Sequence, residues 1–261
     1  MAKKDYWVER NRKSQQRVSD KSIREIEKQL GEYYSKTANR IIRDFENTYN
    51  KILLSAEEGK TPTPADLYKL DTYWKMLGQT KRELERLGEF QNHLLLRKFT
   101  DTYLAVYNSF AIPGEATFST IDRELAQQMI NGIWCADGKN WSSRIWKNTE
   151  NLQQTLNDML VDCVVRGKKT TELKHYLQDA FGASYYQADR LVRTEIAHIQ
   201  TDATQKRYQE YGIKEVEVFA DEDERRCDVC GKLHGKRYNA FGKLPIPAHA
   251  NCRCCIIPVV E

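Results

Sequence analysis

The stretch IREIEKQLGEYYSKTANRIIRDFENTYNKI, residues 23–52, decides the fold class of this chain. Its apolar and aromatic side chains recur every three or four residues, which is the spacing of one face of an α-helix. The members of this face are Ile23, Ile26, Leu30, Tyr33, Thr37, Ile41, Phe45, Tyr49 and Ile52. They predict one long amphipathic helix from about Ser19 to Glu58, with Ser19 or Asp20 as its N-cap. We interpret this face as a core or bundle surface, and an oligomer-forming coil is the alternative.

Helical spacing continues beyond this stretch as far as residue 211. A helix that starts near Pro64 is expected to break or bend at Gly88. The other expected helices are 90–110, 119–130, 142–165, a short one that opens at residue 170, and 184–211. After Gly212 the pattern changes, and residues 216–219 and 255–260 are expected to form two short paired strands.

These elements predict a mainly α protein, with a long-helix body and a small C-terminal α+β module stabilised by zinc. The expected divisions are a basic flexible arm (1–18), a helical N-terminal region (19–112), a helical core (113–212) and a zinc-binding β module (213–261). The last division has too few apolar residues to fold alone. A metal ion can supply the missing stability, because zinc binding contributes roughly 10–16 kcal/mol to the folding of small zinc domains.

The composition argues against a membrane protein and against a secreted one. The 261 residues have a mean hydropathy of −0.71, and 30% of them are charged. No apolar run approaches the ~20 residues of a membrane span, and the polar N-terminus lacks the apolar region of a secretory signal. Synthesis in the cytoplasm is therefore expected, where reduced thiols favour metal binding over disulfides. Cys135 and Cys163, away from the other cysteines, are expected to be buried small apolar residues.

The net charge of +4 is concentrated at the N-terminus. Residues 1–28 hold nine Lys or Arg against five Asp or Glu, so the rest of the chain sums to zero. A basic arm can contact nucleic acid or an acidic protein surface, and a solvated, frayed terminus is the alternative. The cations predicted to contact nucleic acid are Lys3, Lys4, Arg10, Arg12, Lys13 and Arg17.

Five of the seven cysteines follow residue 226, and four of these lie in the motifs CDVC (227–230) and HANCRC (249–254). A tetrahedral zinc ion takes four sulfur or imidazole donors, and each motif supplies two at i, i+3 spacing. The predicted ligands are Cys227, Cys230, His249 and Cys252. Cys254 can replace Cys252, and His234 is a weaker candidate. Four strong donors leave no open position for catalysis, so we predict a closed structural site; free thiols are the alternative.

Two other patterns carry chemistry less specifically. Glu195 and His198 share one helical face and could transfer protons. The simpler interpretation is that Arg193 and Glu195 form ion pairs at the surface or between helices. The tryptophans are also clustered, at positions 134, 141 and 146. Such a cluster can stack on sugars or bases, but it more often anchors a core around a tight turn.

Five motifs in this order carry a family resemblance. They are Trp134-Cys-Ala-Asp-Gly138, Trp141-Ser-Ser-Arg-Ile-Trp146, Arg193-Thr-Glu195, Asp221-Glu-Asp-Glu-Arg-Arg-Cys227-Asp-Val-Cys230 and Pro247-Ala-His249-Ala-Asn-Cys252-Arg-Cys254. Together they resemble the tailed-phage minor head protein, or phage head morphogenesis, family (Mu F-like). The resemblance covers about residues 115–258, and the leading helices are similar to the N-terminal region of members from phages of Gram-positive bacteria. One departure is Ala250, where the family often has proline.

The resemblance implies a non-enzymatic virion or procapsid component that associates with the portal vertex. Such a protein acts in head morphogenesis and in genome packaging and delivery, inside a procapsid assembled in the bacterial cytoplasm. The implied partners are the portal protein, a scaffold or major capsid protein and packaged double-stranded DNA, with no membrane. The resemblance places metal binding at the four predicted ligands and leaves the role of Arg193 and Glu195 open. The rival hypotheses are a zinc-dependent hydrolase, either nuclease or protease, and a DNA-binding accessory protein. Some family members carry a toxin domain after this region, and none is expected here.

Overall fold

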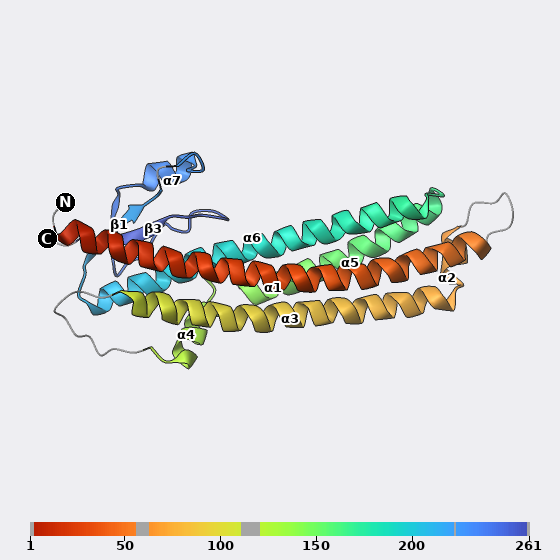
Figure 1. Cartoon of the computed structure of the whole chain (residues 1–261), viewed down its shortest axis with the longest axis horizontal. Coiled ribbons are helices and arrows are strands. Elements are labelled where there is room, and N and C mark those ends of the chain that lie inside the picture. Colours follow the sequence, from red (N-terminus) through yellow and green to blue (C-terminus); the bar gives the residue numbers. More distant parts are fainter. Residues whose placement is uncertain (1–2, 56–62, 111–120, 222, 260–261) are drawn as a thin grey trace. The chain divides into compact units, whose positions relative to one another are not determined.

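The computed structural model describes residues 3–55, 63–110, 121–221 and 223–259; the predicted boundary between residues 112 and 113 lies outside them (Figure 1). The described chain is mainly helical, as predicted. Its elements are α1 (Lys3–Ser55), α2 (Pro64–Tyr68), α3 (Asp71–Ser109), α4 (Arg123–Ile130), α5 (Trp141–Val165), α6 (Thr170–Glu210), β1 (Glu215–Phe219), α7 (Asp228–Leu233), β2 (Arg237–Asn239) and β3 (Cys255–Pro258).

These elements form two compact units. The strand-bearing unit comprises residues 1–27, 94–141 and 190–261, and the all-helical unit comprises residues 28–93 and 142–189. This division differs from the four consecutive segments predicted, because α1, α3 and α6 each contribute residues to both units.

Helix α1 begins at Lys3 and not at Ser19, so the prediction of a flexible arm over residues 1–18 is wrong for the described part. The predicted N-cap Ser19 is buried within the helix, where its hydroxyl donates a 2.6 Å hydrogen bond to Gln200 of α6. Gln15 and Asn11, about one and two turns earlier, are buried on the same face. This segment therefore packs through polar side chains, and a search for apolar spacing does not detect it.

Two expected helix breaks are also absent from the structure. Helix α3 runs through Gly88, because the ring of Trp146 lies against this position: an added Cβ would stand 2.6 Å from the Trp146 Cζ3 atom. Glycine is needed here for close packing and not for a bend. Residues 170–210 form one helix, α6, although two were predicted. Phe181 and Ser184, near the expected break, are buried and hold that segment in the helix.

The core of the all-helical unit contains the apolar face that defined the fold class. Ile41, Phe45 and Tyr49 of α1 are each at most 1% exposed, which confirms the core interpretation. The Tyr49 hydroxyl donates to the Cys163 carbonyl at 2.9 Å and lies 2.6 Å from the Lys168 carbonyl. Cys163 is itself fully buried, as predicted, whereas Cys135 is only partly buried, so the prediction for Cys135 is wrong. The Cys163 carbonyl also accepts the Lys168 backbone N–H at 3.0 Å, so Tyr49 supplies a second donor where α5 ends.

The strand-bearing unit contains an antiparallel three-stranded sheet in the order β2-β1-β3. The two predicted strands are present as β1 and β3, with Val218 opposite Ile256. Strand β2 was not predicted, because three residues with one aromatic side chain give no alternating pattern. Val216, Val218 and Ile256 are buried at 0–1% exposure, in a small core that also contains Cys230, Cys252 and Cys254.

In the described ranges, none of the helices has an apolar stretch of the length that crosses a bilayer.

Candidate metal centre and its supporting contacts

Helix α7 presents the first pair of predicted ligands. Cys227 is its N-cap, and the Cys227 sulfur accepts the Cys230 backbone N–H at 3.4 Å. This turn brings Cys227, which is exposed, and Cys230, which is buried, to one side of the same short helix. Such a turn supplies two metal donors without the need for a larger domain.

The second pair, His249 and Cys252, belongs to the loop between β2 and β3 and lies close to the first pair. His249 Nε2 lies 3.2 Å from the Cys227 sulfur and 3.1 Å from the Cys230 sulfur, and the Cys252 sulfur lies 3.8 Å from that of Cys230. Around a tetrahedral zinc ion, donors are separated by about 3.8 Å for two sulfurs and about 3.5 Å for sulfur and nitrogen. The Cys230–Cys252 separation matches that of two sulfurs on one zinc ion, and the two sulfur–nitrogen separations are somewhat shorter than expected around such an ion.

His249 is oriented for binding through its outer nitrogen. Its Nδ1 donates to the Ala250 carbonyl at 2.8 Å, and this bond raises the pKa of the imidazole. With the proton fixed on Nδ1, the lone pair of Nε2 faces the two sulfurs.

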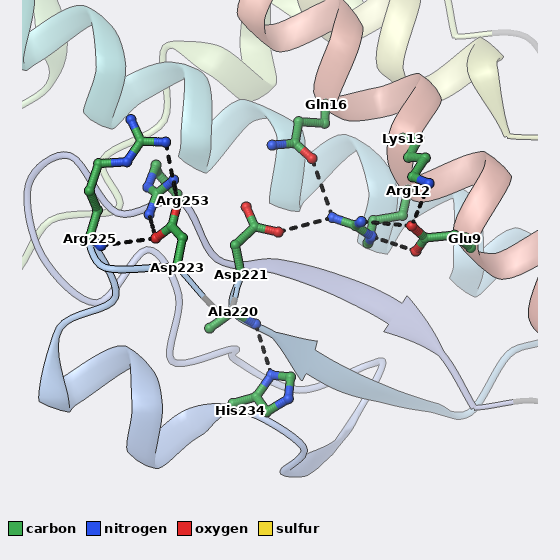
Figure 2. Close-up of polar contacts among 10 residues, drawn as sticks. All are labelled: Glu9, Arg12, Lys13, Gln16, Ala220, Asp221, Asp223, Arg225, His234 and Arg253. Carbon is green, nitrogen blue, oxygen red and sulfur yellow. Dashed lines mark hydrogen bonds and ion pairs between the residues drawn. The ribbon is translucent and has the colours of Figure 1, made fainter.

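The cluster holds one more donor than a tetrahedral ion needs. Cys227, Cys230 and His249 form one group of mutually close donor atoms, and Cys230, Cys252 and Cys254 form another. Cys230 belongs to both groups. Cys252 and Cys254 are therefore the two candidates for the fourth ligand beside Cys227, Cys230 and His249. His234, the weaker candidate, belongs to neither group: its Nδ1 accepts the Ala220 backbone N–H at 3.1 Å (Figure 2).

The four clustered thiols differ in how readily they lose a proton. A hydrogen bond with Cys254 lowers the pKa of Cys252 to about 5, and the Cys230 backbone N–H lowers the pKa of Cys227. Burial raises the pKa of Cys230 to about 12, and the bond to Cys252 raises that of Cys254. Because a metal binds thiolates, metal binding at this cluster must release protons.

An ion pair ties together the two loops that carry the ligands. Arg253, between the two cysteines of the CRC sequence, donates two hydrogen bonds to Asp223, at 2.8 and 2.5 Å (Figure 2). Asp223 also accepts the Arg225 backbone N–H at 3.0 Å. The Arg253 guanidinium holds the pKa of Asp223 well below its ordinary value. This bidentate contact fixes the acidic stretch before Cys227 to the chain beside Cys252.

A second arginine ties helix α1 to the start of the same loop. Arg12 forks onto both oxygens of Glu9, donates to Asp221 at 3.2 Å and lies 4.4 Å above the ring of Phe219 (Figure 2). The paired guanidinium lowers the pKa of Glu9 to about 2. Arg12 was predicted as a nucleic-acid contact, but the structure directs its side chain into the protein, so that prediction is wrong.

The other predicted cationic contacts have different positions. Arg10, Lys13 and Arg17 are exposed on α1. Lys3 and Lys4 belong to α1, but their side chains lie outside the described residues.

The Arg193-Thr-Glu195 motif connects three separate parts of the strand-bearing unit. Arg193 pairs with Glu27 of α1. Thr194 accepts the Asn251 backbone N–H at 3.2 Å, inside the ligand loop. Glu195 is 3% exposed and accepts the indole N–H of Trp134 at 3.0 Å. The motif is therefore a structural junction, and sequence reasoning missed Thr194 because its partner is 57 residues away.

The three clustered tryptophans, at positions 134, 141 and 146, contact other parts of the protein. The Trp134 ring stacks on His198 with centroids 4.3 Å apart, so the imidazole of the predicted acid–base pair is covered on one face. Trp141 is 3% exposed and meets Phe99 edge-to-face at 5.6 Å. With Trp146 over Gly88, these contacts favour the core-anchor interpretation.

Comparison with known proteins matches residues 154–257 to the family model described as phage Mu protein F like protein. These residues are similar to the phage Mu F-like family. The matched segment covers less than half of the chain, and it contains the Arg193-Thr-Glu195 junction and all five clustered donors. The two tryptophan motifs, which the resemblance had included, lie before it. The similarity of this segment is to a phage head-related family.

One curated relative carries the name of an enzyme. The chain is 28% identical over 144 residues to the NAD(+)--arginine ADP-ribosyltransferase EFV of Enterococcus faecalis (strain ATCC 700802 / V583). The match covers 48% of this chain, which spans only 29% of that protein. No solved structure matches the chain.

Proposed function

We propose that this protein is a non-enzymatic minor head component of a tailed bacteriophage. It associates with the portal vertex and acts in head morphogenesis and in genome packaging and delivery. The observation that carries the proposal is the Mu F-like match over residues 154–257, which includes the whole donor cluster. The portal protein is the principal proposed partner, with a scaffold or major capsid protein and packaged double-stranded DNA as further partners. The proposed location is the interior of the procapsid and virion, after assembly in the bacterial cytoplasm.

We further propose that the donor cluster holds a structural zinc ion through Cys227, Cys230, His249 and Cys252. Clustered sulfur and imidazole donors favour zinc over hard cations, which prefer oxygen. The small core around the three-stranded sheet supports this proposal. It contains few large apolar side chains, so a metal ion that joins α7 to the ligand loop adds stability where packing is thin.

The geometry gives little support to the hydrolase hypothesis. A catalytic zinc needs three protein ligands and an open position, whereas this cluster offers five donors. Glu195 is engaged by the Trp134 indole, and burial lowers the pKa of His198 to about 4. A general base works best with a pKa near the working pH, so this imidazole is poorly matched to proton transfer. The activity named for the E. faecalis relative is not part of the proposal.

Co-sedimentation with procapsids tests the proposal. Procapsids assembled with and without portal protein are mixed with the purified full-length chain and separated on a gradient. We expect the chain to travel with portal-containing particles and to remain unbound when portal is absent. Equal binding to both particles, or binding to neither, contradicts the portal assignment.

An activity assay tests the non-enzymatic part. The chain is incubated with double-stranded DNA, scaffold protein and NAD⁺, each with zinc or magnesium. No turnover is expected. Cleavage or protein modification that disappears in a Glu195→Gln variant of unchanged fold contradicts the proposal and supports an enzyme.

A further inference from the structure

The N-terminal part of α1 carries a line of exposed cations that the sequence pattern did not isolate. Five Lys or Arg side chains follow one another at spacings of three and four residues, and all are exposed. This cationic stripe consists of Arg10, Lys13, Arg17, Lys21 and Arg24. At 100° and 1.5 Å per residue, the five positions fall within an arc of about 80° and extend along about 21 Å of the helix.

The opposite face of the same helix segment is the buried one. Asn11, Gln15, Ser19 and Ile26 are each at most 8% exposed, and they lie roughly half a turn away from the stripe. Hydrogen bonds fix this buried face: Ser19 bonds to Gln200, and Thr102 of α3 donates to Ser22 at 2.7 Å. The stripe is thus presented outward by a helix that is anchored within the strand-bearing unit.

The carboxylates near the stripe neutralise only part of it. Glu9 pairs with Lys13 at 3.1 Å but is held mainly by Arg12, and Glu25 lies 3.9 Å from Lys21 while Lys98 donates to it at 2.5 Å. Between Arg10 and Arg24, the sequence contains a single carboxylate, Asp20. Arg12 and Lys98, which point inward, therefore pair with the flanking carboxylates Glu9 and Glu25. The stripe keeps a net positive charge.

We infer that the cationic stripe of α1 binds the phosphate backbone of double-stranded DNA without regard to base sequence. A straight helix with cations about 4.5–6 Å apart along its axis matches a long polyanion better than a small ligand. Three of the five cations are arginines, whose planar guanidinium pairs with phosphate through two hydrogen bonds. The stripe has no side chain suited to intercalation, and contact with phosphates alone gives positioning without sequence readout.

This inference deepens the proposed function, since packaged DNA is the partner, but its test does not depend on portal binding. The stripe variant is the full chain with Lys13, Arg17 and Lys21 changed to Gln. The control variant changes Lys36, Arg43 and Lys51 of the same helix to Gln. Both variants remove one exposed Arg and two exposed Lys, so they have the same net charge. Circular dichroism checks that both remain helical.

Binding to a 30-base-pair duplex of mixed sequence is measured by fluorescence anisotropy at several salt concentrations. We expect the stripe variant to bind at least about tenfold more weakly than wild type and to lose about 2–3 from the slope of log K against log salt. The control variant should keep wild-type affinity and slope. Equal losses in the two variants, or no loss in either, overturn the inference.

A poly-glutamate competitor separates DNA from an acidic protein as partner. Unlabelled duplex should displace the labelled duplex from the chain far more strongly than poly-glutamate of equal charge does. If poly-glutamate binds more tightly than DNA and only this binding depends on the stripe, the DNA inference is overturned in favour of an acidic protein surface. Procapsid co-sedimentation of the stripe variant shows whether portal association survives independently.

Discussion

The backbone N–H of Asn251 donates a 3.2 Å hydrogen bond to the hydroxyl of Thr194. Asn251 lies between two predicted metal ligands, and its φ of 61° places it in the left-handed region that few residues other than glycine and asparagine adopt readily. Thr194 lies in the middle of the Arg193-Thr-Glu195 motif on α6. The bond therefore fixes a turn of unusual backbone conformation against a long helix, next to the donor cluster.

Removal of this hydroxyl should weaken the ligand loop. Thr194→Val keeps the shape of the side chain but removes the acceptor for Asn251. We expect a loss of about 1 kcal/mol in unfolding free energy and faster removal of zinc by a chelator. Thr194→Ser retains the hydroxyl and serves as the control. If the Val and Ser variants release metal at the same rate, the hydrogen bond does not support the loop.

Metal content should follow the predicted ligands. Elemental analysis of wild type is expected to give one zinc per chain, and Cys227→Ser should lose it. Cys135→Ser, which changes a cysteine outside the cluster, should retain it. A folded wild-type protein free of metal contradicts the zinc proposal.

The fourth ligand can be identified by comparing Cys252→Ser with Cys254→Ser. Because Cys252 lies 3.8 Å from Cys230, as two sulfurs on one zinc do, its loss should reduce zinc affinity more than loss of Cys254. We expect the Cys252 variant to lose more than the ~100-fold typical of a residue that only orients a ligand. Competition with a chromogenic chelator measures both affinities. The reverse order assigns the fourth position to Cys254.

The N-terminal segment of α1 should depend on Arg12. Arg12→Gln removes the contacts to Glu9, Asp221 and Phe219 and should cost about 1–2 kcal/mol of unfolding free energy. Arg17→Gln, at an exposed position of the same helix, should change stability by less than about 0.5 kcal/mol. Chemical denaturation measures both. Equal stabilities would show that this segment of α1 is not held by the arginine.

Stability should depend on pH through His198. Burial lowers its folded pKa to about 4, whereas an exposed histidine has a pKa near 6.5. Between these values the unfolded chain binds a proton that the folded chain does not, so stability falls as pH decreases through this window and is unaffected above it. The loss reaches at most ~3 kcal/mol.

His198→Phe keeps a ring against Trp134 but cannot titrate. The difference in stability between wild type and this variant should therefore change between pH 6.5 and 4 and be constant at higher pH. Urea denaturation at several pH values measures this difference. A difference that is constant across the whole range contradicts a buried neutral imidazole.

Local patterns in the sequence determined the main features of this protein. The apolar face of residues 23–52 predicts a long helix, because a period of 3.6 needs no partner to be recognised. The sequence also predicts the donor cluster. Two i, i+3 pairs of soft ligands supply the four donors of a tetrahedral ion once the loop between them brings the pairs together. The ordered motifs around Arg193 and Cys227 likewise predicted the Mu F-like family over residues that the comparison then matched.

Tertiary structure alone decided the rest. Residues 3–18 continue the helix with Asn11 and Gln15 buried and with Arg12 in contact with Asp221 and Phe219. Helix α3 continues through Gly88 because the Trp146 ring covers it. The roles of Arg193, Thr194 and Glu195 depend on partners 166, 57 and 61 residues away in the chain. The inward direction of Arg12 separates it from the exposed stripe beside it. A hydrogen bond or ion pair between distant residues leaves no periodic trace in the sequence, so only the folded chain shows which cations and carboxylates are already paired.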